Sequence, residues 1–190
     1  MRWGWLMTER TDLLPPAQRE NPPDVAMQVA SMMSDINMEF AHGRPEGACI
    51  PMSYVYAEIL RKLGIPTRIA ETAVEVKARG DARTAMTHSP DNSDFLGHCV
   101  VYLPTHKWFV DVSLHTQHSQ VIANAMPSRF PLYVRFDHRK HKVATAKLER
   151  GSAKYTTFRL KGNFWPRAAF PWRGLDAFAD AYVDEFRRHV

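Results

Sequence analysis

Three residues of this sequence have the types that thiol-based acyl chemistry requires: Cys49, His98 and Asp111. In such chemistry a thiolate attacks a carbonyl carbon and an imidazole accepts and returns a proton. A carboxylate orients the imidazole and stabilises its charged form. Each residue alone has a commoner structural role, since a single cysteine among apolar residues is usually a small core side chain. The set has chemical meaning only if separate elements bring the three side chains together.

Cys49 stands at the start of a predicted helix in the segment GACIPMSYVYAEILRKLGIPTR, residues 47–68. Apolar residues recur there at helical spacing: Met52, Val55, Tyr56, Ile59, Leu60 and Leu63. Gly64 and Pro66 end the helix, and Pro51 is tolerated only in its first turn. The free N–H groups and the dipole at a helix N-terminus favour a thiolate over a thiol. The sequence therefore favours Cys49 as a nucleophile.

His98 and Asp111 fall on the two strands of a predicted β-hairpin, GHCVVYL-PTHK-WFVDVS. If Leu103 faces Trp108 across a four-residue turn, the alternation of side chains places His98 and Asp111 on one face. They would be diagonal neighbours, roughly 7–8 Å apart at the backbone, which is close enough for their side chains to meet. Cys99 would point to the opposite face, where we expect it to be plain core.

The rest of the chain predicts an α+β fold, with N-terminal helices and an antiparallel sheet on which the Cys49 helix packs. Residues 8–23 are polar and proline-rich, and we expect residues 1–23 to form an extended lead-in. A helix capped by Asp24 follows, with a stripe of Val25, Val29, Met32, Ile36 and Phe40. Residues 77–95 predict a long polar loop, and residues 174–190 a C-terminal helix. The segments PLYVRF, HKVATAKLE and AKYTTFRLK predict further strands.

Length and composition fit one globular domain over residues 1–190, because 45% of the residues are hydrophobic. Two cysteines are too few for a disulfide framework, which favours a reducing compartment. No signal segment stands out, and no apolar run is long enough to cross a bilayer. We therefore expect a cytoplasmic protein without a membrane partner.

The positive charge lies in the C-terminal third of the chain. The net charge is −3 over residues 1–127 and +8 over residues 128–190. Between residues 135 and 173 of the predicted basic β-hairpin region, 128–173, aromatic residues alternate with Lys and Arg: Tyr155, Phe158, Phe164, Trp165, Phe170 and Trp172. Such a surface can bind nucleic acid or an acidic partner through phosphate contacts and base stacking. The alternative, which we prefer, is that the aromatic rings face inward and the charges only solvate the outer face.

A metal site is a weaker interpretation of the histidines. His115 and His118 are three residues apart and close to Asp111 in sequence, a spacing that could bind zinc. Asp111 has a better use beside His98, and no cysteine pair lies nearby. We expect neither a metal nor a cofactor.

The region 46–114 resembles the transglutaminase-like superfamily of papain-type cysteine enzymes. The resemblance rests on Cys49 followed by LRKLGIPTR, the strand with His98 and the strand with Asp111, in that order. It implies a papain/transglutaminase-like fold and a Cys-His-Asp triad at these three positions. The superfamily contains peptidases, amidases, protein cross-linkers and deglycosylating enzymes, together with members that have lost activity.

The leading expectation is an enzyme that cleaves or transfers an amide-type acyl group, on a small or protein substrate, through a Cys49 thioester. Hydrolysis and transfer share their first half-reaction, so the sequence leaves that choice open. Two other classes stay open as well. One is a catalytically silent binding module with the same fold, and the other is a nucleic-acid or acidic-partner binder acting through residues 135–173.

Overall fold

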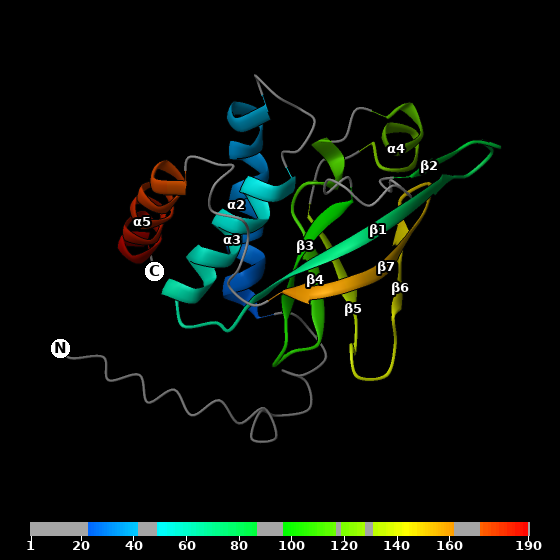
Figure 1. Ribbon diagram of the computed structural model, residues 1–190. Coiled ribbons are helices and arrows are strands. Elements are labelled where there is room, and N and C mark those ends of the chain that lie inside the picture. Colours follow the sequence, from blue (N-terminus) through cyan, green and yellow to red (C-terminus); the bar gives the residue numbers. More distant parts are fainter. Residues whose placement is uncertain are drawn as a thin grey trace.

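The structure is an α+β arrangement in which helices cover one side of an antiparallel sheet (Figure 1). It is a computed structural model that describes residues 23–41, 49–86, 97–116, 119–127, 131–161 and 172–189. The expected lead-in therefore lies outside the described residues, apart from Pro23.

Three longer helices lie together on one side of the sheet: α2 (Asp24–Ala41), α3 (Cys49–Lys62) and α5 (Trp172–His189) (Figure 1). A short helix, α4 (Gln120–Ala125), lies apart from them beside β1 and β2, and follows the 3-10 turn η2 (Leu114–Thr116). The end of α3 is as predicted, because Gly64 has φ 83° and the Ile65 N–H donates to Leu60 O at 2.8 Å.

The sheet has seven strands among the described residues, and each pairing is antiparallel. The strands are β1 (Arg68–Ala78), β2 (Thr84–Met86), β3 (His98–Leu103), β4 (Trp108–Asp111), β5 (Leu132–Arg135), β6 (Val143–Leu148) and β7 (Gly151–Lys161). Their order is β5-β4-β3-β1-β7-β6, with β2 paired to β1 outside this path. The two edge strands, β5 and β6, also contact each other, so the sheet curls into a nearly closed barrel.

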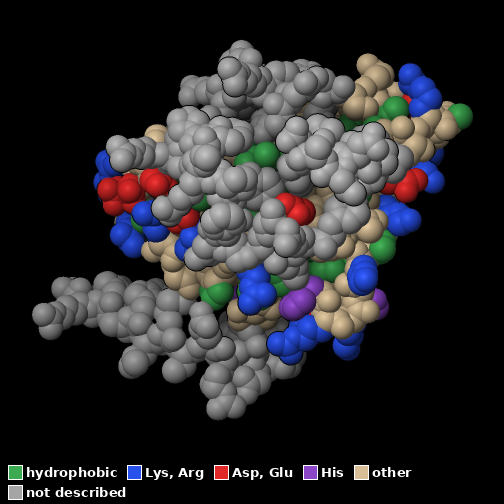
Figure 2. Space-filling view, in the orientation of Figure 1, with side chains coloured by type: hydrophobic (Ala, Val, Ile, Leu, Met, Phe, Trp, Pro, Cys, Tyr) green, Lys and Arg blue, Asp and Glu red, His purple; other side chains and the backbone are tan. Residues whose placement is uncertain are grey.

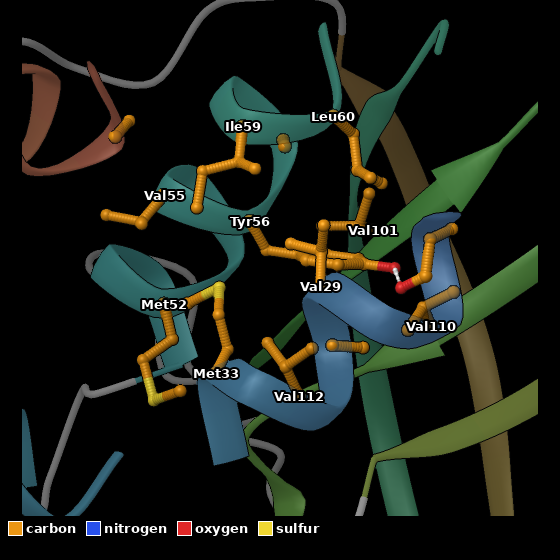
Figure 3. Packing of buried hydrophobic residues seen from close by; sticks show 14 of the residues in the cluster. Val29, Met33, Met52, Val55, Tyr56, Ile59, Leu60, Val101, Val110 and Val112 are labelled. Carbon is orange, nitrogen blue, oxygen red and sulfur yellow. Dashed lines mark hydrogen bonds between the residues drawn. The ribbon is translucent and has the colours of Figure 1, made fainter. Parts of the chain in front are cut away.

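The first of two apolar cores fills the space between the helices and the sheet. Figure 3 shows Val29 and Met33 of α2 facing Tyr56 and Met52 of α3. The Tyr56 hydroxyl is fully buried and donates a hydrogen bond to Ala26 O at 2.9 Å. This bond satisfies the polar end of a core side chain and ties the two helices together.

The second core lies inside the curled sheet. Alternate residues of each strand point into it, as in β6, where Ala144, Ala146 and Leu148 are buried and the residues between them are exposed. Tyr102, Phe109 and Phe136 pack there in edge-on and stacked arrangements. The strand alternation therefore explains both cores, one on each face of the sheet.

Several predicted details are wrong on the helices. On α2, Met33 is buried while Met32 of the predicted stripe is 36% exposed, because the buried face is set by contacts with α3. The side chains of Ile36 and Phe40, the last two residues of that stripe, lie outside the described part. On α3, the spacing of Glu58 and Lys62 predicts an i,i+4 ion pair. Glu58 instead pairs with Arg61 at 2.6 Å, and Lys62 pairs with Asp180 of α5.

The loops also differ from expectation. The predicted loop 77–95 contains β2, which pairs with the end of β1, while residues 87–96 lie outside the described part. No sequence pattern predicted α4, and α5 begins at Trp172 rather than at residue 174. The basic region is not one hairpin, because β5 pairs with β4 while β6 and β7 pair with each other.

Candidate active site

Cys49 is the first residue of α3, as predicted, and its side chain is only 3% exposed. One turn further along α3, the Ser53 hydroxyl donates a hydrogen bond to Cys99 O at 3.0 Å. Ser53 and this carbonyl are fully buried, so the bond fixes the start of α3 against the start of β3. The thiol is thereby held beside the strand that carries His98.

The β3–β4 hairpin has the predicted register, with Leu103 opposite Trp108. His98 and Asp111 consequently lie on one face, and the His98 Nε2 to Asp111 Oδ2 distance is 2.7 Å. Both side chains are 0–1% exposed, which makes this a buried contact. The backbone of His98 is fixed from β1, because the Thr72 hydroxyl donates to His98 O at 3.1 Å.

Asp111 accepts hydrogen bonds at both carboxylate oxygens. Oδ1 accepts from the backbone N–H groups of Ser113, at 3.0 Å, and Leu114, at 2.9 Å. Oδ2 accepts from the Tyr155 hydroxyl at 2.8 Å as well as from His98. A carboxylate with this many donors has a fixed orientation, so it can fix the imidazole in turn.

The contact with Asp111 determines which nitrogen of His98 carries its proton. An ionised carboxylate only accepts hydrogen bonds, so His98 Nε2 must be the donor. Nδ1 of His98 is buried and has no hydrogen-bond partner of standard geometry among the described residues. In the neutral ring this nitrogen is the free base.

The pKa shifts of Cys49 and His98 are mutual. The pKa of the Cys49 thiol lies well below its usual range because the Cys99 side chain hydrogen-bonds to it, and the His98 side chain and its charge also stabilise the thiolate, against the effect of burial. Burial disfavours a charged His98, but Asp111 and then Cys49 outweigh it and raise the pKa of His98 to about 10. Burial also opposes ionisation of Asp111, whose pKa is nevertheless lowered by the charge of His98. Together these shifts favour a thiolate–imidazolium pair.

The sequence missed two members of this cluster. Tyr155 of β7 was singled out only as one aromatic residue of the basic region, yet its side chain is fully buried and contacts Asp111. Cys99 is buried in the core, as expected, but it also affects the thiol of Cys49. The alternation of β7 could have placed Tyr155 inside the sheet, whereas nothing local indicates which strand it faces.

The chain was compared with protein-family models, with curated proteins and with solved structures. Nothing matches it in any of the three comparisons.

The described residues hold no group of three His, Cys, Asp or Glu side chains suited to a metal ion. His115 lies in η2, and His118 is outside the described part of the chain. Nor does any helix in that part have the length and apolarity to cross a membrane.

In the basic region, the described side chains follow the alternation of the strands. Tyr155 points inward, while Lys147 and Lys154 are exposed on the outer face. The side chains of the other five aromatic residues lie outside what the structure describes. The polar segment RFDHRKHK predicts a solvated hairpin tip around His138. His138 is instead partly buried, with Nδ1 2.8 Å from the Tyr102 hydroxyl.

Proposed function

We propose that this protein is a cysteine-dependent acyl enzyme with a papain/transglutaminase-like fold. Cys49 is the nucleophile, His98 is the general acid and base, and Asp111 orients His98. The observation that carries the proposal is the buried contact of His98 Nε2 with Asp111 Oδ2 at 2.7 Å, on a strand whose start is bonded to the first turns of α3 through Ser53 and Cys99 O. The mutual pKa shifts of Cys49 and His98 agree with this placement. The resemblance of residues 46–114 to the transglutaminase-like superfamily supports the same roles.

The reaction follows from these roles. The Cys49 thiolate adds to the substrate carbonyl, and a tetrahedral oxyanion forms as the C–S bond is made. The backbone N–H of Cys49, at the N-terminus of α3, is a suitable donor for that oxyanion. When the C–N bond breaks, the imidazolium of His98 gives its proton to the leaving amine. A thioester at Cys49 and a neutral His98 remain.

The second half-reaction reverses the first with a new nucleophile. Nδ1 of His98 accepts a proton from water or from an amine, which attacks the thioester and displaces the Cys49 thiolate. Water gives hydrolysis to a carboxylic acid, and an amine gives transfer to a new amide. The substrate is thus an amide or related acyl compound, free or on a protein, and none of these steps needs a cofactor.

The test is labelling with an electrophilic thiol probe, followed by mass-spectrometric mapping of the modified residue. At neutral pH we expect Cys49 to react faster than a model thiol, because its pKa is lowered, while Cys99 with 0% exposure stays unlabelled. The variant His98→Gln should slow labelling of Cys49 by at least about tenfold, a change of about 1.4 kcal/mol or more in activation free energy. Equal labelling of Cys49 and a model thiol would instead favour a silent binding module.

A further inference from the structure

A cavity that is open to solvent and shares no residue with the triad is lined by three arginines, Arg79, Arg83 and Arg150, whose side chains are exposed. It has a volume of about 480 Å³ and lies where the end of β1, the β6–β7 turn and α4 meet. Its lining residues are Ala78, Arg79, Gly80, Asp81, Arg83, Asn124 and Arg150. In Figure 2, Lys and Arg side chains gather at the upper right, near α4 and β2.

The backbone around this cavity is fixed by two hydrogen bonds to Arg150. The Arg79 N–H donates to Arg150 O at 2.7 Å, and the Arg150 N–H donates to Ala125 O at 2.9 Å. Arg150 thereby ties the end of β1 to the end of α4. Gly80, with φ 80°, allows the chain to turn sharply at the rim. Backbone hydrogen bonds thus fix the positions of Arg79 and Arg150, and substituting either side chain leaves these bonds in place.

Asp81, the acidic residue in the lining, already forms an ion pair with Arg83. Asp81 Oδ1 accepts from the N–H and Nε of Arg83, at 2.9 and 3.0 Å, and Oδ2 accepts from Arg83 Nη2 at 2.8 Å. This forked pairing, first through the side chain and then through the backbone of Arg83, lowers the pKa of Asp81 to about 2. Asp81 therefore stays ionised and neutralises Arg83.

Arg79 and Arg150 have no such counterion. Neither guanidinium has an ion pair or side-chain hydrogen bond with any residue that the structure describes. Three arginines and one aspartate give the lining a net charge of +2. Two unpaired guanidiniums on separate segments can grip different oxygens of one anion, and each fork matches phosphate geometry.

We propose that this cavity binds a small phosphorylated compound carrying at least two negative charges. The volume exceeds what a single phosphate fills and lies within the range of sites for small organic ligands, roughly 300–1,000 Å³. Ala78 is the one apolar residue of the lining, so the organic part of the ligand is polar rather than aromatic. The site shares no residue with the Cys49, His98 and Asp111 cluster, and the proposal is independent of the acyl chemistry.

Calorimetric titration at constant ionic strength tests the proposal, with inorganic phosphate, pyrophosphate, a sugar phosphate and the dicarboxylate malonate as probes. We expect saturable one-to-one binding of a phosphate probe. Phosphate or pyrophosphate binding tighter than the sugar phosphate identifies a free anion, and the reverse order identifies a phosphate ester. Tighter binding of malonate than of every phosphate probe would overturn the phosphate class.

The matched variants are Arg79→Gln and Arg150→Gln in the cavity and Arg139→Gln in the exposed β5–β6 turn. Each removes one charge, but only the first two should weaken phosphate binding, by about tenfold or more for each lost charge-assisted contact. Cys49→Ala should bind phosphate as the unaltered protein does, which separates this site from the proposed enzyme. The proposal is wrong if binding does not saturate below about 10 mM, a very weak affinity. It is also wrong if Arg139→Gln weakens binding as much as the cavity variants.

Discussion

The Tyr155 hydroxyl donates a hydrogen bond to Asp111 Oδ2 at 2.8 Å across the interior of the curled sheet. Tyr155 belongs to β7 and Asp111 to β4, two strands that are separated in the sheet by β3 and β1. Burial, together with the charge of Asp111, raises the pKa of Tyr155 well above its usual value, so this hydroxyl stays a donor. The curling of the sheet thus brings Tyr155 of β7 to Asp111 of β4, where its hydroxyl helps to hold the carboxylate of the proposed triad.

Replacing Tyr155 with Phe should weaken both the fold and the site. The variant leaves one lone pair of a buried carboxylate without its donor, which typically costs about 1.5–3 kcal/mol for a bond to a charged group. With a less firmly held Asp111, the pKa of His98 should fall and labelling of Cys49 should slow. Urea unfolding measures the first effect, and the rate of thiol alkylation at neutral pH measures the second.

The matched control is Tyr54→Phe. The Tyr54 hydroxyl also bonds to an aspartate, Asp176 of α5, at 2.6 Å, but on the helical side of the molecule. This variant loses the same atom from the same kind of pair, so we expect lower stability with unchanged Cys49 alkylation. Equal alkylation rates in the Tyr155 and Tyr54 variants would show that Tyr155 has no positioning role.

The pH profile of turnover should be broad, and its acid limb should lie at a lower pH than an ordinary thiol would give. Activity requires the Cys49 thiolate, whose pKa is lowered through Cys99 and His98, so the acid limb should lie well below the ordinary thiol value of about 8.5. It also requires protonated His98, so the alkaline limb should follow its raised pKa of about 10. Rates of thioester formation at closely spaced pH values would reveal both limbs, and an acid limb near pH 8.5 would contradict the ion pair.

The free energy of unfolding should also depend on pH, because folding changes the pKa of His98. The folded-state pKa of His98, about 10, exceeds the value of about 6.5 expected in the unfolded chain. Its contribution to the free energy of unfolding is therefore fully present below about pH 6.5 and is lost as the pH rises through about 10. Urea titrations of the unaltered protein and of Asp111→Asn should converge at alkaline pH, because the variant lacks the partner that raises this pKa.

Cys99→Ala should change the reactivity of Cys49. The hydrogen bond from the Cys99 side chain is the largest contribution to the lowered pKa of Cys49, so its loss should raise that pKa. The alkylation profile of Cys49 would then move toward higher pH, while its plateau rate stays similar. Ser53→Ala is the control, because it loosens the same strand through Cys99 O without touching the sulfur of Cys99. A profile that moves equally in both variants would mean a loosened helix rather than a lost hydrogen bond.

The parts of this site that the sequence predicts are those with local signals. Gly64 and Pro66 end the α3 helix, and a turn of four residues sets the pairing of Leu103 with Trp108. Pro51 in the first turn places Cys49 at the start of that helix, and the turn places His98 and Asp111 on one face because side chains alternate along each strand.

The missing parts depend on contacts between distant segments. Tyr155 reaches Asp111 over a separation of 44 residues, and no local pattern encodes how far a sheet curls. Helix α4 has only six residues, too short for a periodic signal, and β2 is three residues long within a polar segment. The choice of Met33 over Met32 for the core likewise depends on the partner helix.

Replacing Gly151 should lower the stability of the protein for a reason unrelated to catalysis. The prediction tests how closely β1 and β7 pack in the curled sheet. A Cβ at this position would lie 2.0 Å from Lys77 O, because β7 begins directly against the end of β1. Gly151→Ala therefore forces the two strands apart, and we expect a loss of about 1–3 kcal/mol, the usual cost of overpacking. Gly174 of α5 provides the opposite case, since a Cβ there would have nothing within 4 Å and Ala is favoured over Gly in a helix by up to about 1 kcal/mol. Denaturant unfolding should thus show Gly151→Ala destabilised and Gly174→Ala neutral to stabilised. Equal stability of the two variants would mean that β1 and β7 do not approach each other as closely as the backbone indicates.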